Sequence, residues 1–153
     1  MLLTLRPLAF LCSAALLTAC ATPTDSLPTP RSAQQIAQQS IIIDTHIDVP
    51  YRLHKDWEDV TVATQRGEFD YPRAQAGGLN APFMSIYIPA SYERTGGGYQ
   101  LANQLIDSME ALVGRAPDKF AMAYSTADVQ NQFGSAKVSL ALGMENGTPI
   151  EGK

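Results

Sequence analysis

The chain has 153 residues, with 11 basic and 15 acidic side chains and a net charge of −4. This acidic balance excludes the broad basic surface that nucleic-acid-binding proteins present. Only Cys12 and Cys20 are present, and Cys12 falls in a segment that we expect to be removed. The composition therefore excludes a disulfide framework in the mature chain.

Residues 1–20 have the pattern of a bacterial lipoprotein signal peptide. Arg6 is the only charge in this segment, and the apolar stretch 8–17 is short for a membrane span. The stretch leads to Leu17-Thr18-Ala19-Cys20, which resembles the site cut by lipoprotein signal peptidase. We expect lipid on Cys20, which anchors a protein without a spanning helix. An ordinary secretory signal is the alternative.

Residues 21–39 contain three prolines and many small polar residues, as is typical of a flexible tether. We expect at most a turn or two of helix at its end. The residue after Cys20 is Ala21 and not aspartate, which favours the outer membrane of a Gram-negative cell, facing the periplasm. Residues 40–153 then have the size of one small domain.

Strands and helices are expected to alternate through this domain. Apolar runs predict strands at 40–49, 81–88, 120–124 and 137–144, with Pro50 ending the first. Residues 51–71 are polar and irregular, with Trp57 and Phe69 as packing anchors. Helices are expected at 99–113 and 125–133, with a short one near Tyr71.

The order of elements indicates an α/β fold with parallel strands. A doubly wound sheet and a (β/α)8 barrel both fit this order. A whole barrel takes ~250 residues, so for a barrel we expect only its N-terminal portion here, an incomplete barrel.

Ionisable side chains stand at the ends of two predicted strands. Asp44, His46 and Asp48 alternate along the first, so we expect all three on one face. Ionisable groups that become buried need partners or a metal, and imidazole and carboxylate groups are zinc ligands. Glu145 follows the most apolar strand, and parallel strands open on a common face at their carboxyl ends. Taken singly, these groups also fit a solvated strand end and an ordinary turn.

Three motifs together resemble the membrane (renal) dipeptidase family of zinc peptidases. They are D-x-H-x-D-x-P at 44–50, the glycine-led strand at 77–89 and G-M-E-N-G at 143–147. The resemblance implies a (β/α)8 barrel that holds two Zn²⁺ ions, and a homodimer is possible in the complete protein. It also implies hydrolysis of dipeptides by a hydroxide that the zinc ions activate.

The resemblance assigns roles to four residues. His46 and Asp48 match the family's first two zinc ligands, and Glu145 matches the carboxylate that bridges the ions. Asp44 is expected to orient His46 or its strand without binding metal. His54 has no counterpart among the family's ligands, so we expect it on the surface or in a loop.

The family's remaining site residues all follow the bridging glutamate. They are two histidine ligands, a histidine near the reacting carbonyl, and an arginine and an aspartate for the substrate termini. We therefore expect no complete catalytic set in this chain, weak zinc binding and no hydrolysis by the chain alone. Two alternatives stay open: another metal-dependent hydrolase on the same barrel, and a non-catalytic surface lipoprotein with a dipeptidase-like half domain.

Overall fold

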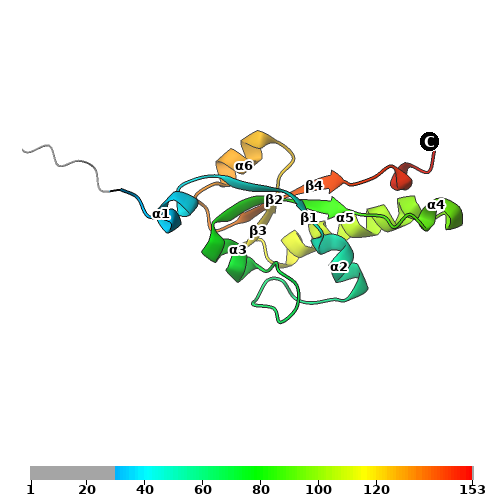
Figure 1. Cartoon of the computed structure of the whole chain (residues 1–153), viewed down its shortest axis with the longest axis horizontal. Helices are drawn as coiled ribbons and strands as arrows, with labels where there is room; N and C mark the ends of the chain where they lie inside the picture. Colours follow the sequence, from blue (N-terminus) through cyan, green and yellow to red (C-terminus); the bar gives the residue numbers. More distant parts are fainter. Residues whose placement is uncertain (1–29, 153) are drawn as a thin grey trace, which may run out of the picture. The chain divides into compact units, whose positions relative to one another are not determined.

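The computed structural model describes residues 30–152. The predicted signal peptide with Cys20 and residues 21–29 of the predicted tether lie outside them. The elements in chain order (Figure 1) are α1 (Ala33–Gln38), β1 (Ile42–Ile47), α2 (Val49–Lys55), α3 (Tyr71–Gly77), β2 (Leu79–Ile86), α4 (Tyr92–Thr95), α5 (Gly98–Arg115), β3 (Phe120–Met122), α6 (Thr126–Gln132), β4 (Val138–Met144) and the 3-10 turn η1 (Thr148–Ile150). Within 30–152, no helix has the length and apolar character that a membrane crossing requires.

The four strands form one sheet in the order β1-β2-β4-β3, and every neighbouring pair is parallel. This confirms the predicted α/β fold with parallel strands. The short strand β3 pairs only with the beginning of β4, where Phe120 lies opposite Val138. As a result β2 is flanked by β1 and β4, the two strands whose ends carry the candidate site residues.

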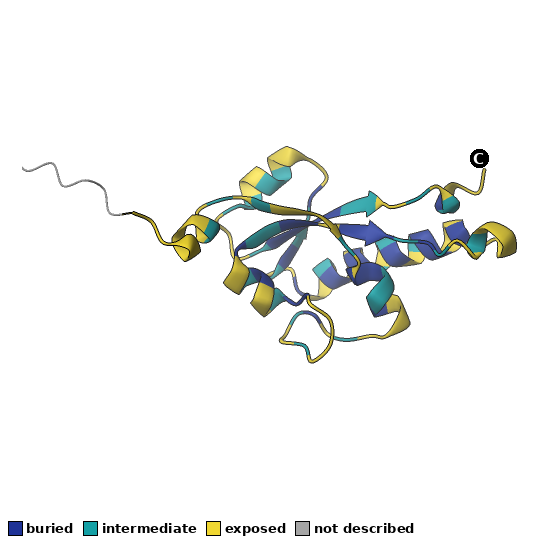
Figure 2. Ribbon diagram, in the orientation of Figure 1, coloured by how far each residue is buried: buried dark blue, intermediate teal, exposed yellow. Residues whose placement is uncertain are grey.

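Helices α2, α3 and α5 supply the core that covers one face of the sheet (Figure 2). Along α5, Leu101, Leu105, Met109 and Leu112 are exposed by 3% or less, which confirms the apolar stripe expected there. Burying one such side chain stabilises a fold by ~1.5–3 kcal/mol. The stripe therefore holds α5 firmly against the sheet that carries the site.

The sequence prediction missed α2, which begins at Val49 directly after β1. The strand ends at Ile47, before Pro50, and Pro50 instead occupies the first turn of this helix, where a missing N–H costs no helical hydrogen bond. The prediction that Trp57 is a packing anchor is wrong. The residue is 54% exposed, and its ring lies at the surface under the Arg115 guanidinium, 4.7 Å from the centroid. Phe69 is buried as expected, at 4%.

Helix α1 lies within the range predicted as a tether. It begins with a capping box between Ser32 and Gln35. The side-chain amides of Gln34 and Gln38 donate to backbone oxygens of Ala76 and Gln75 in α3, each at 3.0 Å. These contacts attach α1 to α3, and the compact unit accordingly starts at Arg31.

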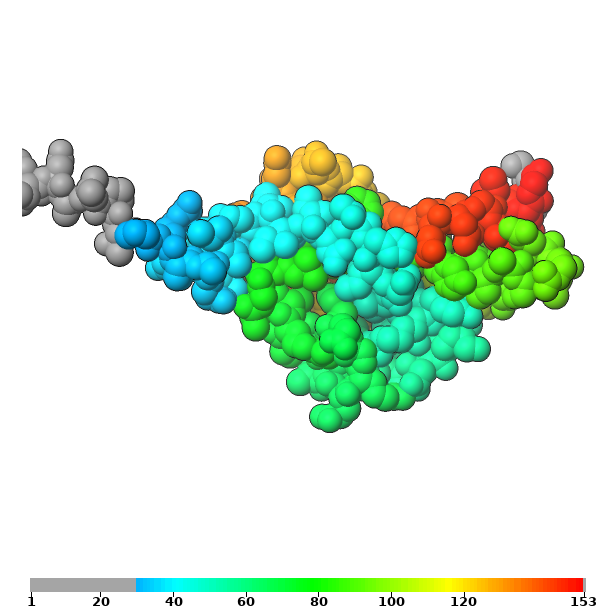
Figure 3. Space-filling model, in the orientation of Figure 1, coloured from blue at the N-terminus to red at the C-terminus, as the bar shows by residue number. Residues whose placement is uncertain are grey.

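The segment after β4 is attached to the beginning of α5, and Figure 3 shows the two at the same end of the molecule. A carboxylate oxygen of Glu151 accepts hydrogen bonds from the backbone N–H groups of Gly97, at 3.0 Å, and Tyr99, at 3.2 Å. Negative charge is favourable at this end of a helix. The chain is therefore held on both sides of Glu145, by β4 before it and by α5 after it.

Candidate metal centre

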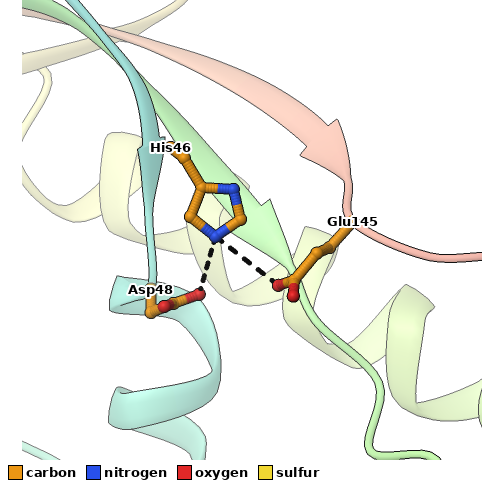
Figure 4. A group of neighbouring side chains, drawn as sticks. All are labelled: His46, Asp48 and Glu145. Atoms are coloured by element: carbon orange, nitrogen blue, oxygen red, sulfur yellow. Dashed lines mark ion pairs between the residues drawn. The ribbon is translucent and has the colours of Figure 1, made fainter.

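His46, Asp48 and Glu145 meet at the carboxyl ends of β1 and β4 (Figure 4). His46 Nε2 lies 3.3 Å from Asp48 Oδ1 and 3.5 Å from Glu145 Oε2. One ligand atom from each residue lies within 4.8 Å of the others. The structure thus brings together the three residues that the sequence pointed to, in a group that solvent can reach.

Asp48 stands at the N-terminal cap position of α2, yet its side chain makes no capping hydrogen bond. Aspartate is among the preferred residues at this position because its carboxylate accepts from the first helical N–H groups. Here the carboxylate lies beside the His46 imidazole instead. A carboxylate that is kept out of its usual structural role is available to bind a ligand.

Asp44 lies outside the three-residue group, because the pairing of β1 with β2 is irregular. Asp44 pairs with Pro82 and Ile47 with Met84, so three steps along β1 match two along β2. Such a shift breaks the regular alternation from which Asp44, His46 and Asp48 were expected on one face.

Asp44 lines a pocket of about 500 Å³ together with Asp48, Arg52 and Arg73. Its Oδ1 still accepts a hydrogen bond from the backbone N–H of His46, at 3.0 Å. This contact fits the role expected from the family, that of orienting the strand behind His46, and the role itself stays a prediction. His54 lies exposed on α2 and is not a member of the group.

Strand β2 holds Glu145 in place. The Ser85 hydroxyl donates to Glu145 Oε2 at 2.8 Å, and the Glu145 N–H donates to the backbone oxygen of Ile86 at 3.4 Å. The next side chain, Asn146, donates to the backbone oxygen of Ile88 at 2.9 Å. Sequence reasoning missed Ser85 and Asn146, although a lone serine in the apolar run 81–86 was a visible signal.

The donor atoms and their spacing fit zinc. Zinc binds imidazole nitrogen and carboxylate oxygen at ~2.0–2.2 Å, so two such donors on one tetrahedral ion lie ~3.3–3.6 Å apart. His46 Nε2 is separated from the two carboxylates by 3.3 and 3.5 Å, within this range. The spacing is therefore compatible with a set of zinc ligands.

An ionic network organises the loop between α2 and α3, beside the site. The Arg52 guanidinium lies 3.2 Å from the Glu58 carboxylate. The Asp70 carboxylate is 1% exposed and accepts from the backbone and side chains of both Thr64 and Arg73. Burial raises the pKa of Asp70, but these hydrogen bonds outweigh it and hold the pKa well below its usual range.

Residues 30–153 match the membrane dipeptidase family, peptidase family M19. The chain belongs to this family. Dipeptidase ataJ of Aspergillus terreus is 28% identical over 125 residues, which cover 74% of this chain and 30% of that protein. Dipeptidase aclJ of Aspergillus oryzae is 31% identical over 86 residues, 52% of this chain and 20% of that protein. The chain thus spans less than a third of the length of these two membrane dipeptidase relatives.

Solved structures of dipeptidases share the fold. The probable dipeptidase PvdM of Pseudomonas aeruginosa aligns with a TM-score of 0.64 and 18% identity, over 75% of this chain and 30% of its own. A metallopeptidase of Rhodobacter sphaeroides, liganded with a phosphinate mimic of the dipeptide L-Ala-D-Ala, aligns with a TM-score of 0.61 and 20% identity. The alignment covers 71% of this chain and 39% of that one. The parallel sheet of this chain matches part of the barrel of the membrane dipeptidase family, as the sequence predicted.

Proposed function

We propose that this chain contributes the first part of a two-zinc site, and that the complete protein hydrolyses dipeptides. The observation that carries the proposal is the meeting of His46, Asp48 and Glu145 at a spacing suited to zinc, in a chain of the membrane dipeptidase family.

Each residue of the group has a distinct part in the proposed site. His46 and Asp48 would hold one ion, since their ligand atoms are 3.3 Å apart. Glu145 would face two ions, because its carboxylate has two oxygens and β2 fixes only one of them through Ser85. When bound, a pair of zinc ions supplies a nucleophile active near neutral pH and polarises the scissile carbonyl.

We also propose that the domain is held at the outer membrane, facing the periplasm, by lipid on Cys20. Lipid at this position anchors a protein without a spanning helix. The following segment, with its prolines and small polar residues, would separate the domain from the membrane surface.

Zinc titration of the chain tests the proposal. We expect isothermal titration to show weak binding of Zn²⁺ to the wild-type chain. Glu145→Gln should lower the Zn²⁺ affinity by more than the ~10–100-fold that removal of a supporting group costs. Glu110→Gln, an exposed carboxylate on α5, is the matched control and should bind as the wild type does. Equal uptake by the wild type and Glu145→Gln would refute the assignment of Glu145.

A hydrolysis assay of the same chain with dipeptides tests whether the site is partial. We expect no turnover, because the site lacks the residues that follow Glu145 in the family. Turnover above background would show that the three ligands suffice. A complete protein that contains no stoichiometric zinc would instead favour a non-catalytic surface lipoprotein.

A further inference from the structure

Ser85 is one of three buried polar side chains in the part of the chain that the structure describes, with Asp70 and Ser139. Asp70 caps α3, and Ser139 donates to the side chain of Gln132 on α6. Both of those contacts stabilise the fold away from the candidate metal centre. Ser85 alone among the three bonds to a residue of the candidate metal centre, donating to Glu145 at 2.8 Å.

The geometry of β2 and β4 directs the Ser85 hydroxyl toward the metal centre. Ser85 pairs with Gly143 across the two parallel strands. Residues two apart share a face of a strand, so Glu145 lies on the same face of the sheet as Gly143 and its partner Ser85. Glu145 Oε2 then has two neighbours, the Ser85 hydroxyl at 2.8 Å and His46 Nε2 at 3.5 Å.

The hydrogen bond from Ser85 leaves most acceptor positions of the Glu145 carboxylate free. An ionised carboxylate has about four acceptor positions, so Oε2 keeps a lone pair for a metal and the second oxygen stays available. Glu145 is also one-third exposed (33%), so without the hydroxyl its long side chain would be free to turn into solvent.

We propose that Ser85 is a positioning residue of the metal centre: its hydroxyl holds Glu145 Oε2 toward His46 before any metal binds. The inference rests on the proposed function, because it concerns the same site. Holding a ligand in its bound orientation removes part of the ordering that binding otherwise requires. Groups that orient metal ligands in this way raise metal affinity.

A purely structural role for Ser85 predicts something different. If the hydroxyl only supports packing, its removal changes stability and leaves metal affinity alone. Removal should in fact cost the fold little, because the exposed Glu145 carboxylate can bond to water in place of Ser85. The two roles are therefore separated by measuring metal affinity and stability on the same variants.

Zn²⁺ titration and the visible absorption of bound Co²⁺ test the inference on the whole chain. We expect Ser85→Ala to raise the Kd for Zn²⁺ about tenfold and to change the Co²⁺ bands, with little change in thermal unfolding. Ser85→Thr, which keeps the hydroxyl, should bind as the wild type does. Ser139→Ala removes a buried hydroxyl on the neighbouring strand and should leave both metal readouts unchanged.

A second pair of variants tests the inference if Ser85→Ala folds poorly. Ser85→Thr and Ser85→Val have nearly the same shape and differ in the hydroxyl, so Ser85→Val should bind Zn²⁺ about tenfold more weakly than Ser85→Thr. Equal affinities within this pair, or between wild type and a folded Ser85→Ala, overturn the inference and leave the proposed site standing. If the wild type takes up neither Zn²⁺ nor Co²⁺, the proposed metal site itself fails, and the role of Ser85 fails with it.

Discussion

Replacing Asp70 by asparagine tests how the loop beside the site is held. One oxygen of Asp70 accepts from the Arg73 N–H at 2.8 Å, which caps α3. The other accepts from the Thr64 N–H at 2.9 Å, the Thr64 hydroxyl at 3.1 Å and the Arg73 guanidinium at 2.8 Å. Asparagine keeps the shape but not the charge, and either orientation of its amide sets an NH₂ group against at least one donor.

The expected loss of stability follows from these contacts. A hydrogen bond to a charged group contributes ~1.5–3 kcal/mol, and a helix cap ~1 kcal/mol. The Arg73 side chain is 42% exposed and can be hydrated instead, and asparagine retains one acceptor. We therefore expect Asp70→Asn to lower the free energy of unfolding by about 2–3 kcal/mol at pH 7.

The loss should also depend on pH. The pKa of Asp70 is depressed in the folded chain, while an aspartate in an unfolded chain has a pKa of ~3.9. The stabilisation is thus fully present above pH ~4 and is lost as the pH falls toward the folded pKa. The difference between wild type and Asp70→Asn should narrow from pH 7 to pH ~3.

Urea unfolding followed by circular dichroism measures this difference. With a slope of ~1–3 kcal/mol per molar urea, the midpoint should fall by roughly 1 M or more. Asp107→Asn, an exposed carboxylate on α5, is the control and should leave the midpoint unchanged. Equal midpoints for the two variants at pH 7, or a gap that widens on acidification, would refute the reasoning.

Three further predictions concern the packing of η1, the loop after β4 and the membrane anchor. Gly98→Ala would place a Cβ 2.9 Å from a backbone oxygen of η1, so thermal unfolding should show a loss of ~1–3 kcal/mol. Gly114→Ala on the same helix meets open space and should gain ~0.5–1 kcal/mol; equal effects would contradict the close contact. Asn146→Ala frees the loop after β4 from the segment that follows β2 and should raise the Kd for Zn²⁺ about tenfold by titration, and an unchanged Kd would count against this role. Cys20→Ser should abolish palmitate labelling and membrane retention of the protein in cells, whereas palmitate incorporation that persists in this variant would rule Cys20 out.

The fold was predictable where the signal is local. Apolar periodicity located the strands and the buried stripe of α5, and the helix expected at 125–133 is α6, which Ser125 caps. The site was predictable for the same reason, because His46 and Glu145 each end an apolar strand and parallel strands open on one face. A rule about strand ends thus placed two residues together that are far apart in the sequence.

The features of the fold and the site that the sequence did not predict depend on pairing between strands, which local patterns do not encode. The register shift that separates Asp44 from His46 exists only where β1 meets β2. The placement of β4 beside β2, with β3 outside, arises from the whole sheet. The hydrogen bond of Ser85 likewise joins residues sixty positions apart. Helix α2 was missed for another reason. Pro50 was interpreted only as a strand end, although proline is also suited to the first turn of a helix.

Strand β2 provides none of the three candidate ligands, yet it sets the gap between those that β1 and β4 provide. Adjacent strands lie ~4.8 Å apart, so the middle strand acts as a spacer of constant width between histidine and glutamate. Grafting this centre onto another protein would therefore require moving the three-strand block as one piece. A graft of the three ligands alone would omit β2, the strand that sets the distance between them.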